Sequence, residues 1–123
     1  MKGAVTMLES KVIFHIDNFE KWKLMLNDTN LLFNSKNIEK YYIEVLATSE
    51  AVKRFDCNEV LASDIRTMKN LITKGVKFVA CNHSLKEQNV NTKNIMSFVD
   101  IVPTGALELI NRQGDGYIYL PAW

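Results

Sequence analysis

The sequence GVKFVACNHSLKE, residues 75–87, passes from a short apolar run to a polar stretch through a single cysteine. The run from Val76 to Ala80 is rich in β-branched and aromatic residues, which is typical of a buried strand. Gly75 precedes it, as a glycine does where a helix has just ended. The residues from Asn82 to Glu87 are predicted to form the first turn of a new helix. This segment therefore predicts a strand that leads directly into a helix, with Cys81 at the junction.

The same alternation continues on both sides of this segment. Asp17 and Glu20 resemble a capping box, and Thr104 and Gly114 have the residue types that begin and end a helix. Further strands are predicted at 11–16, 41–47, 98–102 and 117–120, and further helices at 18–34, 49–55, 61–72 and 104–113. The pattern predicts an α/β fold, namely a three-layer α/β/α sandwich around a mainly parallel sheet of about five strands.

Length and composition restrict the class of protein further. With 123 residues, the expectation is a single domain over 1–123. The chain has 15 Lys and Arg against 14 Asp and Glu, so its net charge of +1 argues against nucleic-acid and membrane-surface partners. There is no apolar segment of membrane-spanning length and no secretory signal at the start. With only Cys57 and Cys81 as thiols, we expect a cytoplasmic protein without disulfides.

Ligands of parallel α/β sheets bind where the strands end at their carboxyl side, so the residues at those ends are the candidate site. Cys81 and His15 are the candidate catalytic residues, because a thiol and an imidazole are the most reactive side chains there. The candidate ligand-binding residues at the same edge are Asp17, Thr48, Asn82, His83, Thr104 and Gly105.

Cys81 is the most informative of these residues. At a helix N-terminus the macrodipole and the free N–H groups favour the thiolate, which is the nucleophilic form. We expect the first and third strands to lie near each other, which would bring His15 to the sulfur, with His83 as the alternative cation. The competing interpretation is a small buried cysteine that only fills space. Cys57, between Asp56 and Asn58, is expected to be partly exposed and inert.

Other chemistries have weak support. His15, Asp17, Cys81 and His83 have the right types for zinc, but their H-x-D and C-x-H spacings are not those of structural zinc sites, so no metal is predicted. The glycine patterns of dinucleotide and P-loop sites and the nucleophile elbow are missing, and no cofactor is predicted. Glu44 lies inside a predicted strand and needs a partner if buried, either Arg112 or a Lys from another subunit.

The sequence resembles the DsrE/DsrF-like family from Lys11 to Trp123. The matching pieces are VIFHID (12–17), NLLFN (30–34), IEVLA (43–47), GVKFVACNHSL (75–85) and VPTGALELINRQGDGYIYLPAW (102–123). The resemblance implies a small α/β/α domain that forms homo-oligomers, such as trimers or hexamers. It also implies that Cys81 accepts sulfur as a persulfide and hands it on, and that His15 is the family's strand-1 histidine. One departure is the loop 47–50, Ala-Thr-Ser-Glu, where many members have glycines.

Two functions therefore remain open at the level of the sequence. The first is a sulfur carrier, or sulfurtransferase-like protein, that works with sulfur donor and acceptor proteins through Cys81. The alternative is an oligomeric binding module without catalysis, in which the cleft at the strand ends holds a small ligand and Cys81 only lines it. The aromatic end of the chain, with Tyr117, Tyr119 and Trp123, is expected to dock on the body or on a second subunit.

Overall fold

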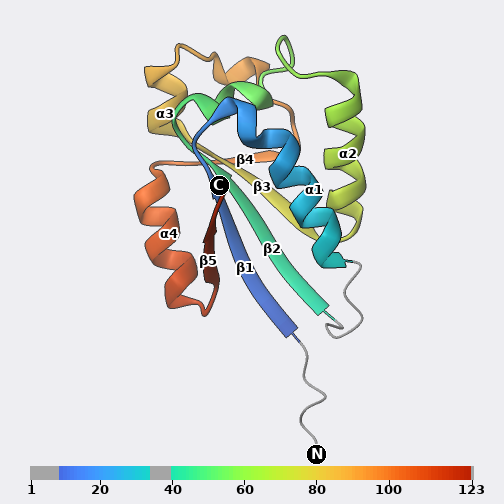
Figure 1. Ribbon diagram of the computed structural model, residues 1–123. Coiled ribbons are helices and arrows are strands. Elements are labelled where there is room, and N and C mark those ends of the chain that lie inside the picture. The colour runs from blue at the N-terminus through green and yellow to red at the C-terminus, as the bar shows by residue number, and fades with distance from the viewer. Residues whose placement is uncertain (1–8, 34–39, 123) are drawn as a thin grey trace, which may run out of the picture.

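A computed structural model describes residues 9–33 and 40–122 of the chain. Its five strands are β1 (Glu9–Ile16), β2 (Lys40–Ala47), β3 (Val76–Cys81), β4 (Val99–Val102) and β5 (Ile118–Pro121). Its α-helices are α1 (Trp22–Phe33), α2 (Ala62–Thr73), α3 (Asn82–Glu87) and α4 (Gly105–Gly114). Three 3₁₀ turns, η2 (Phe19–Lys21), η3 (Ser49–Phe55) and η4 (Thr92–Asn94), lie between them. The predicted α/β class is confirmed, with helices on both sides of the sheet (Figure 1).

The sheet has the strand order β4-β3-β2-β1-β5, and every neighbouring pair is parallel. All five strands therefore present their carboxyl ends to the same edge, as the alternating pattern predicts. The expectation that the first and third strands are close neighbours is wrong, because β2 lies between them. The chain adds β2, β3 and β4 in turn on one side of β1 and then places β5 on its other side.

One face of the sheet carries the large apolar core. The helices α1 and α2 cover this face, and η3 and α3 add Phe55 and Leu85 to it. The rings of Trp22, Phe55 and Phe78 are fully buried and pack edge-on or tilted, with centroids 5.1 to 6.4 Å apart. The indole N–H of Trp22 donates to the Ala51 carbonyl oxygen at 2.8 Å, so its polar atom is satisfied.

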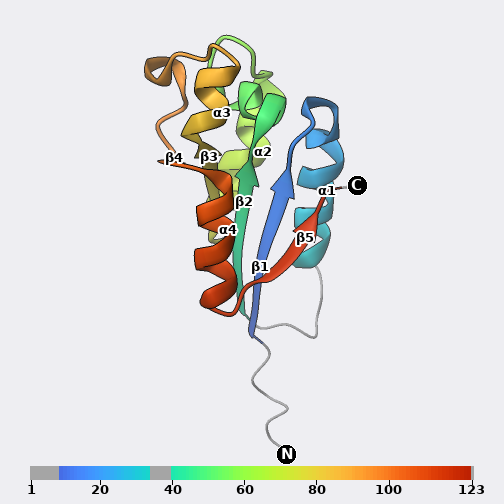
Figure 2. The same ribbon diagram turned by 90° about the vertical axis from the view of Figure 1, so that its left-hand side faces the viewer.

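The other face of the sheet carries α4, as Figure 2 shows with α4 and α1 on opposite sides. Its apolar cluster is much smaller and consists of Ile13, Leu46 and Val79, with Leu109 of α4 packed against it. The buried polar residues Glu44 and Glu108 belong to β2 and α4 respectively. This face therefore buries two ionisable side chains beside a small apolar cluster, whereas the first face buries a large apolar core.

Several helix ends differ from their predicted positions. The first helical segment is capped by Asn18, whose side chain accepts from the N–H of Glu20, rather than by Asp17. The helix α4 runs through Gly114, and the positive φ of 91° that reverses the chain is at Gly116. Gly75 does follow α2 with φ 103°, as predicted. None of the helices within the described ranges is long and apolar enough to cross a membrane.

Candidate functional site

Cys81 is the last residue of β3 and also the N-cap of α3, so the predicted junction is confirmed. The residue is 4% exposed. Its Sγ accepts the backbone N–H of Ser84 at 3.4 Å and that of Gly105 at 3.3 Å. Ser, Thr, Asp and Asn are the usual N-caps, since their oxygens are better acceptors than a thiol. These two backbone donors converge on the sulfur, so Sγ is held at the junction of β3, α3 and α4.

The N-terminus of α4 supplies the second of these donors. Thr104 caps α4 by accepting the N–H of Leu107 at 3.2 Å, and the N–H of Gly105, which has no acceptor within the helix as its first residue, points at Cys81. A Cβ at position 105 would lie 2.6 Å from Cγ2 of Thr48 and 3.9 Å from Cβ of Cys81. Glycine is therefore needed here for close approach, and the ten-residue helix adds its positive end to the environment of the sulfur.

His15 reaches this site through Thr48 rather than directly. Its Nε2 lies 2.8 Å from Thr48 Oγ1, and its Nδ1 lies 3.1 Å from the Tyr119 hydroxyl. Burial lowers the pKa of His15, and the nearby Asp17 carboxylate opposes this only in part. The ring is therefore neutral near pH 7, so it donates one of the two bonds and accepts the other. His15 is therefore a neutral imidazole and not the expected cation. It bonds to Thr48, because β2 and the loop that follows it lie between β1 and β3.

The loop after β2 contains a residue, Ser49, whose structural role local sequence patterns do not single out. Ser49 has φ 50°, in the left-handed region that favours glycine. Its N–H donates to Oγ of the buried Ser84 at 2.8 Å, and Thr48 N–H donates to the Ile16 carbonyl at 2.9 Å. These bonds fix the loop between β1 and α3. The loop 47–50 therefore lacks glycine residues but keeps, at Ser49, the backbone conformation that a glycine would adopt.

The remaining predicted residues lie around this group without joining the hydrogen bonds of the sulfur. Asp17 and Thr104 are exposed, and Asn82 is half-buried. His83 is exposed and lies 3.5 Å from Glu87, so it faces solvent rather than the sulfur. Within the described residues, no three or more His, Cys, Asp or Glu side chains are placed to hold a metal ion. The structure thus brings Cys81, Gly105 and Thr48 into one cluster.

The aromatic end of the chain is described as far as residue 122. Tyr119 contacts His15, and its ring centroid lies 5.9 Å from that of the imidazole. Tyr117 packs against the small apolar cluster under α4. Trp123, the last residue of the predicted docking segment, lies outside the described residues. The two tyrosines therefore dock on the body of their own chain.

The two cysteines differ in exposure: Cys57 is exposed, as its polar neighbours predict, whereas the burial of Cys81 is the feature expected of a cysteine that fills space. Both are free, with Cys57 exposed and Cys81 buried. The N–H of Cys57 donates to the Asn94 carbonyl at 2.8 Å, which anchors the backbone beside the short antiparallel bridge between Asp56 and Ile95. Cys57 therefore serves as an internal reference for an ordinary exposed thiol.

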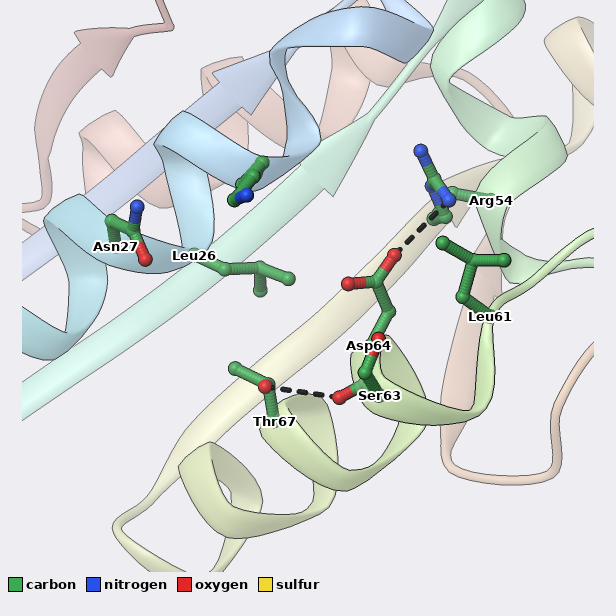
Figure 3. Close-up of a pocket in the computed structure, with 8 residues that line it drawn as sticks. Leu26, Asn27, Arg54, Leu61, Ser63, Asp64 and Thr67 are labelled. Carbon is green, nitrogen blue, oxygen red and sulfur yellow. Dashed lines mark hydrogen bonds and ion pairs between the residues drawn. The ribbon is translucent and has the colours of Figure 1, made fainter.

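A groove lies on the other face of the sheet, between α1 and α2 (Figure 3). Its volume is about 390 Å³. Arg54 closes one end by an ion pair with Asp64 at 3.0 Å, and its guanidinium stacks on the Phe19 ring at 4.1 Å. Because α4 and the α1–α2 pair lie on opposite faces, this groove is separate from the cysteine cluster.

Comparisons with known proteins identify relatives of this fold. The model of the DsrE/DsrF-like family matches residues 11–121. The structure of MTH1491 from Methanobacterium thermoautotrophicum, a protein of unknown function, superposes with a TM-score of 0.79 at 26% identity, over 91% of this chain and 98% of that one. The ychN protein from E. coli superposes with a TM-score of 0.71 at 15% identity over the same shares of the two chains. No curated protein is significantly similar in sequence.

Proposed function

The chain belongs to the DsrE/DsrF-like family, and from that premise we propose that it is a sulfur carrier that holds sulfane sulfur on Cys81. The observation that carries the proposal is the pair of backbone N–H groups on the Cys81 sulfur, from Ser84 and Gly105. A backbone donor needs no reorganisation when the sulfur ionises, so both groups stabilise negative charge as it forms.

The proposed reaction is an exchange of one sulfur atom without net oxidation. The Cys81 thiolate attacks the terminal sulfur of a donor persulfide, R–S–SH. A new S–S bond forms on Cys81 while the S–S bond of the donor breaks, and the donor leaves as its thiolate. The thiolate of an acceptor then attacks the terminal sulfur of Cys81–S–SH in the same way, which regenerates the Cys81 thiolate.

The roles of the neighbouring residues follow from their contacts. Gly105 and Ser84 hold the sulfur through their N–H groups. Thr48 closes the site against Gly105, and His15 is a positioning residue that holds the Thr48 hydroxyl. Both cysteines being free thiols supports a reducing, cytoplasmic setting.

The test is to load the protein from a small persulfide donor and to measure its intact mass under native conditions. In a Cys57→Ser background we expect a gain of one sulfur atom, and peptide mapping should place it on Cys81. The matched control is Cys81→Ser, which keeps an N-cap oxygen in place of the sulfur and should gain none. No loading of Cys81 in the Cys57→Ser protein, or equal loading of Cys57 in the Cys81→Ser protein, would contradict the proposal and favour a binding module.

We also propose that the protein forms homo-oligomers through the outer side of α4. Leu107 is 49% exposed and Ile110 66%, so two large apolar side chains of this helix face solvent. Such a patch is typical of a surface covered by another subunit.

Sedimentation of the protein at micromolar concentration tests this assembly, and a mass above that of one chain is expected. Ile110→Glu should shift the species to the monomer. Leu31→Glu is the matched control, because Leu31 is equally exposed at 66% but lies on α1. A monomeric wild-type protein would refute the assembly without touching the sulfur chemistry.

A further inference from the structure

Glu44 is an ionisable residue in the middle of β2, and it is 2% exposed. Its neighbours in the sheet are Ile13 of β1 and Lys77 of β3. The sequence suggests Arg112 or a lysine of another subunit as its partner. The structure places the carboxyl group of Glu108 on α4 as its hydrogen-bond partner, and Arg112 is one of the two cations close enough to act on it. Two buried acids facing each other call for an explanation, since isolated buried charge is costly.

The contact between the two acids requires a shared proton. A carboxylate can only accept hydrogen bonds, so one of the two groups must be protonated to donate. Burial, followed by the hydrogen bond and the charge of Glu108, raises the pKa of Glu44 to about 8. Oε2 of Glu44 is buried and has no hydrogen-bond partner among the described residues. In that part of the chain, no group is therefore placed on this oxygen to compensate if the proton leaves.

The cations near the pair are also engaged with groups outside it. Arg112 Nε lies 3.7 Å from Glu108, but its Nη2 lies closer to Asp115, at 3.1 Å. The Arg112 guanidinium also stacks over the Tyr117 ring, 5.8 Å from its centroid.

On the strand side, the Lys77 amino group pairs with Asp100 at 3.5 Å. On β1, Lys11 donates to the backbone carbonyl of Asp115. Lys77 and Arg112 lower the pKa of Glu44 only in part, so the proton on the pair is retained near neutral pH.

The pair is linked to the cysteine through the first turn of α4. Glu108 lies three residues after Gly105, and its N–H bonds to the Thr104 carbonyl at 3.2 Å, which closes this turn. The bond from Glu44 to Glu108 thus joins the turn to the central strand of the sheet. The same turn lies against Cys81 and points the Gly105 N–H at its sulfur.

We propose that a single proton shared by Glu44 and Glu108 fixes the first turn of α4 over Cys81, and that loss of this proton releases the turn and exposes the thiol. Two carboxylates in contact repel each other, and the turn is the part free to move because β2 is held on both sides by its neighbouring strands. Such a movement would give a sulfur donor access to the thiol, since Cys81 is 4% exposed and must become accessible before sulfur can be exchanged. The role of this movement in sulfur exchange rests on the proposed function, whereas the movement itself does not depend on it.

The test compares labelling of Cys81 by iodoacetamide in Cys57→Ser protein with and without Glu44→Gln, from pH 6 to pH 9. The glutamine side chain introduced by this substitution keeps the size of the original and its donated hydrogen bond but cannot ionise. Labelling also depends on the state of the thiol, so hydrogen exchange of the turn is measured beside it as a readout of the movement alone. We expect the labelling rate without Glu44→Gln, divided by the rate with it, to be near one at pH 6. The ratio should rise with the deprotonated fraction of the pair, so that half of the rise is reached near pH 8 and about nine-tenths of it by pH 9.

Two further variants keep the test decisive. Glu108→Gln should remove the rise as Glu44→Gln does. Glu87→Gln changes an exposed carboxylate on α3 and should keep the rise. Hydrogen exchange of residues 105–108 should accelerate over the same pH range in the parent protein more than in Glu44→Gln.

The outcomes separate this inference from the proposed function. A constant labelling ratio together with unchanged relative exchange would overturn the release of the turn, even if Cys81 still loads sulfur. A rising ratio in a protein that never loads sulfur would support the release and refute the sulfur carrier.

Discussion

The two faces of the central sheet are built from the same five strands but have opposite characters. The face under α1 and α2 buries a continuous apolar cluster with three aromatic rings at its centre. The face under α4 buries three apolar residues of the sheet and two glutamates, and Cys81 and His15 lie at its edge. The difference indicates that one face supplies most of the stability, which allows the other face to hold groups that a hydrocarbon core would not tolerate.

The largest expected effect is on the apolar face. Phe78→Ala removes a ring that packs against Trp22, Phe55 and Phe98. The cavity and the lost burial should lower the free energy of unfolding by about 3–5 kcal/mol. Denaturant titration measures this loss. A loss below about 1 kcal/mol would show that this face does not carry the stability assigned to it.

The second effect is the pH dependence imposed by the α4 face. The pKa of Glu44 is raised from 4.5 to about 8 in the folded state, so its contribution to stability is complete below pH 4.5 and is lost as the pH rises to about 8. Glu44→Gln removes this loss and should be more stable than the wild type at pH 8 by about 2–4 kcal/mol. Denaturation at pH 5 and pH 8 checks this prediction. Parallel stability curves for the two proteins would contradict it.

A smaller effect is expected where α4 meets the cysteine. Gly105→Ala places a methyl group against Thr48, which must shift, and the change should cost about 1–3 kcal/mol. The matched control is Gly114→Ala in the same helix, where a Cβ meets nothing within 4 Å. This control should be neutral or slightly stabilising, because alanine favours a helix. Equal effects of the two substitutions would mean that the close approach at Gly105 is unimportant.

The smallest effect concerns His15. Its pKa is lowered by burial, so a neutral ring is favoured in the folded state and stability falls as the pH drops below 6.5. His15→Gln should abolish this fall and cost about 1 kcal/mol at pH 7, from weaker bonds to Thr48 and Tyr119. The comparison is made in the Glu44→Gln background, so that Glu44 does not titrate in the same range. If the stability of His15→Gln still falls as the pH drops below 6.5, the fall must come from the titration of another group.

Sequence patterns predict the local parts of this structure and miss the long-range ones. The junction at Cys81, the cap at Thr104 and the helix end at Gly75 follow from residues adjacent in the chain. The strand order does not, because local patterns do not say on which side of β1 each strand is added. For the same reason local patterns do not show that His15 bonds to Thr48, on the loop that follows the intervening strand.

The partners of buried polar groups are also beyond the reach of local patterns. The position of Glu44 in a strand predicts that it needs a partner, but Glu108 lies 64 residues away and reads as an ordinary helical glutamate. Ser49 has a left-handed conformation and bonds to Ser84, which lies 35 residues away in the chain. Neither pairing leaves a signal in sequence spacing.

The most direct test of the sulfur-carrier function is a complete transfer cycle on Cys81, followed by intact mass in the Cys57→Ser protein. The protein is loaded from a persulfide donor, freed of excess donor and then mixed with a small acceptor thiol. We predict that one sulfur atom is gained on Cys81 in the first step and lost to the acceptor in the second, with the unmodified thiol restored. Failure to gain the atom, or its retention in the presence of the acceptor, would contradict a sulfur carrier.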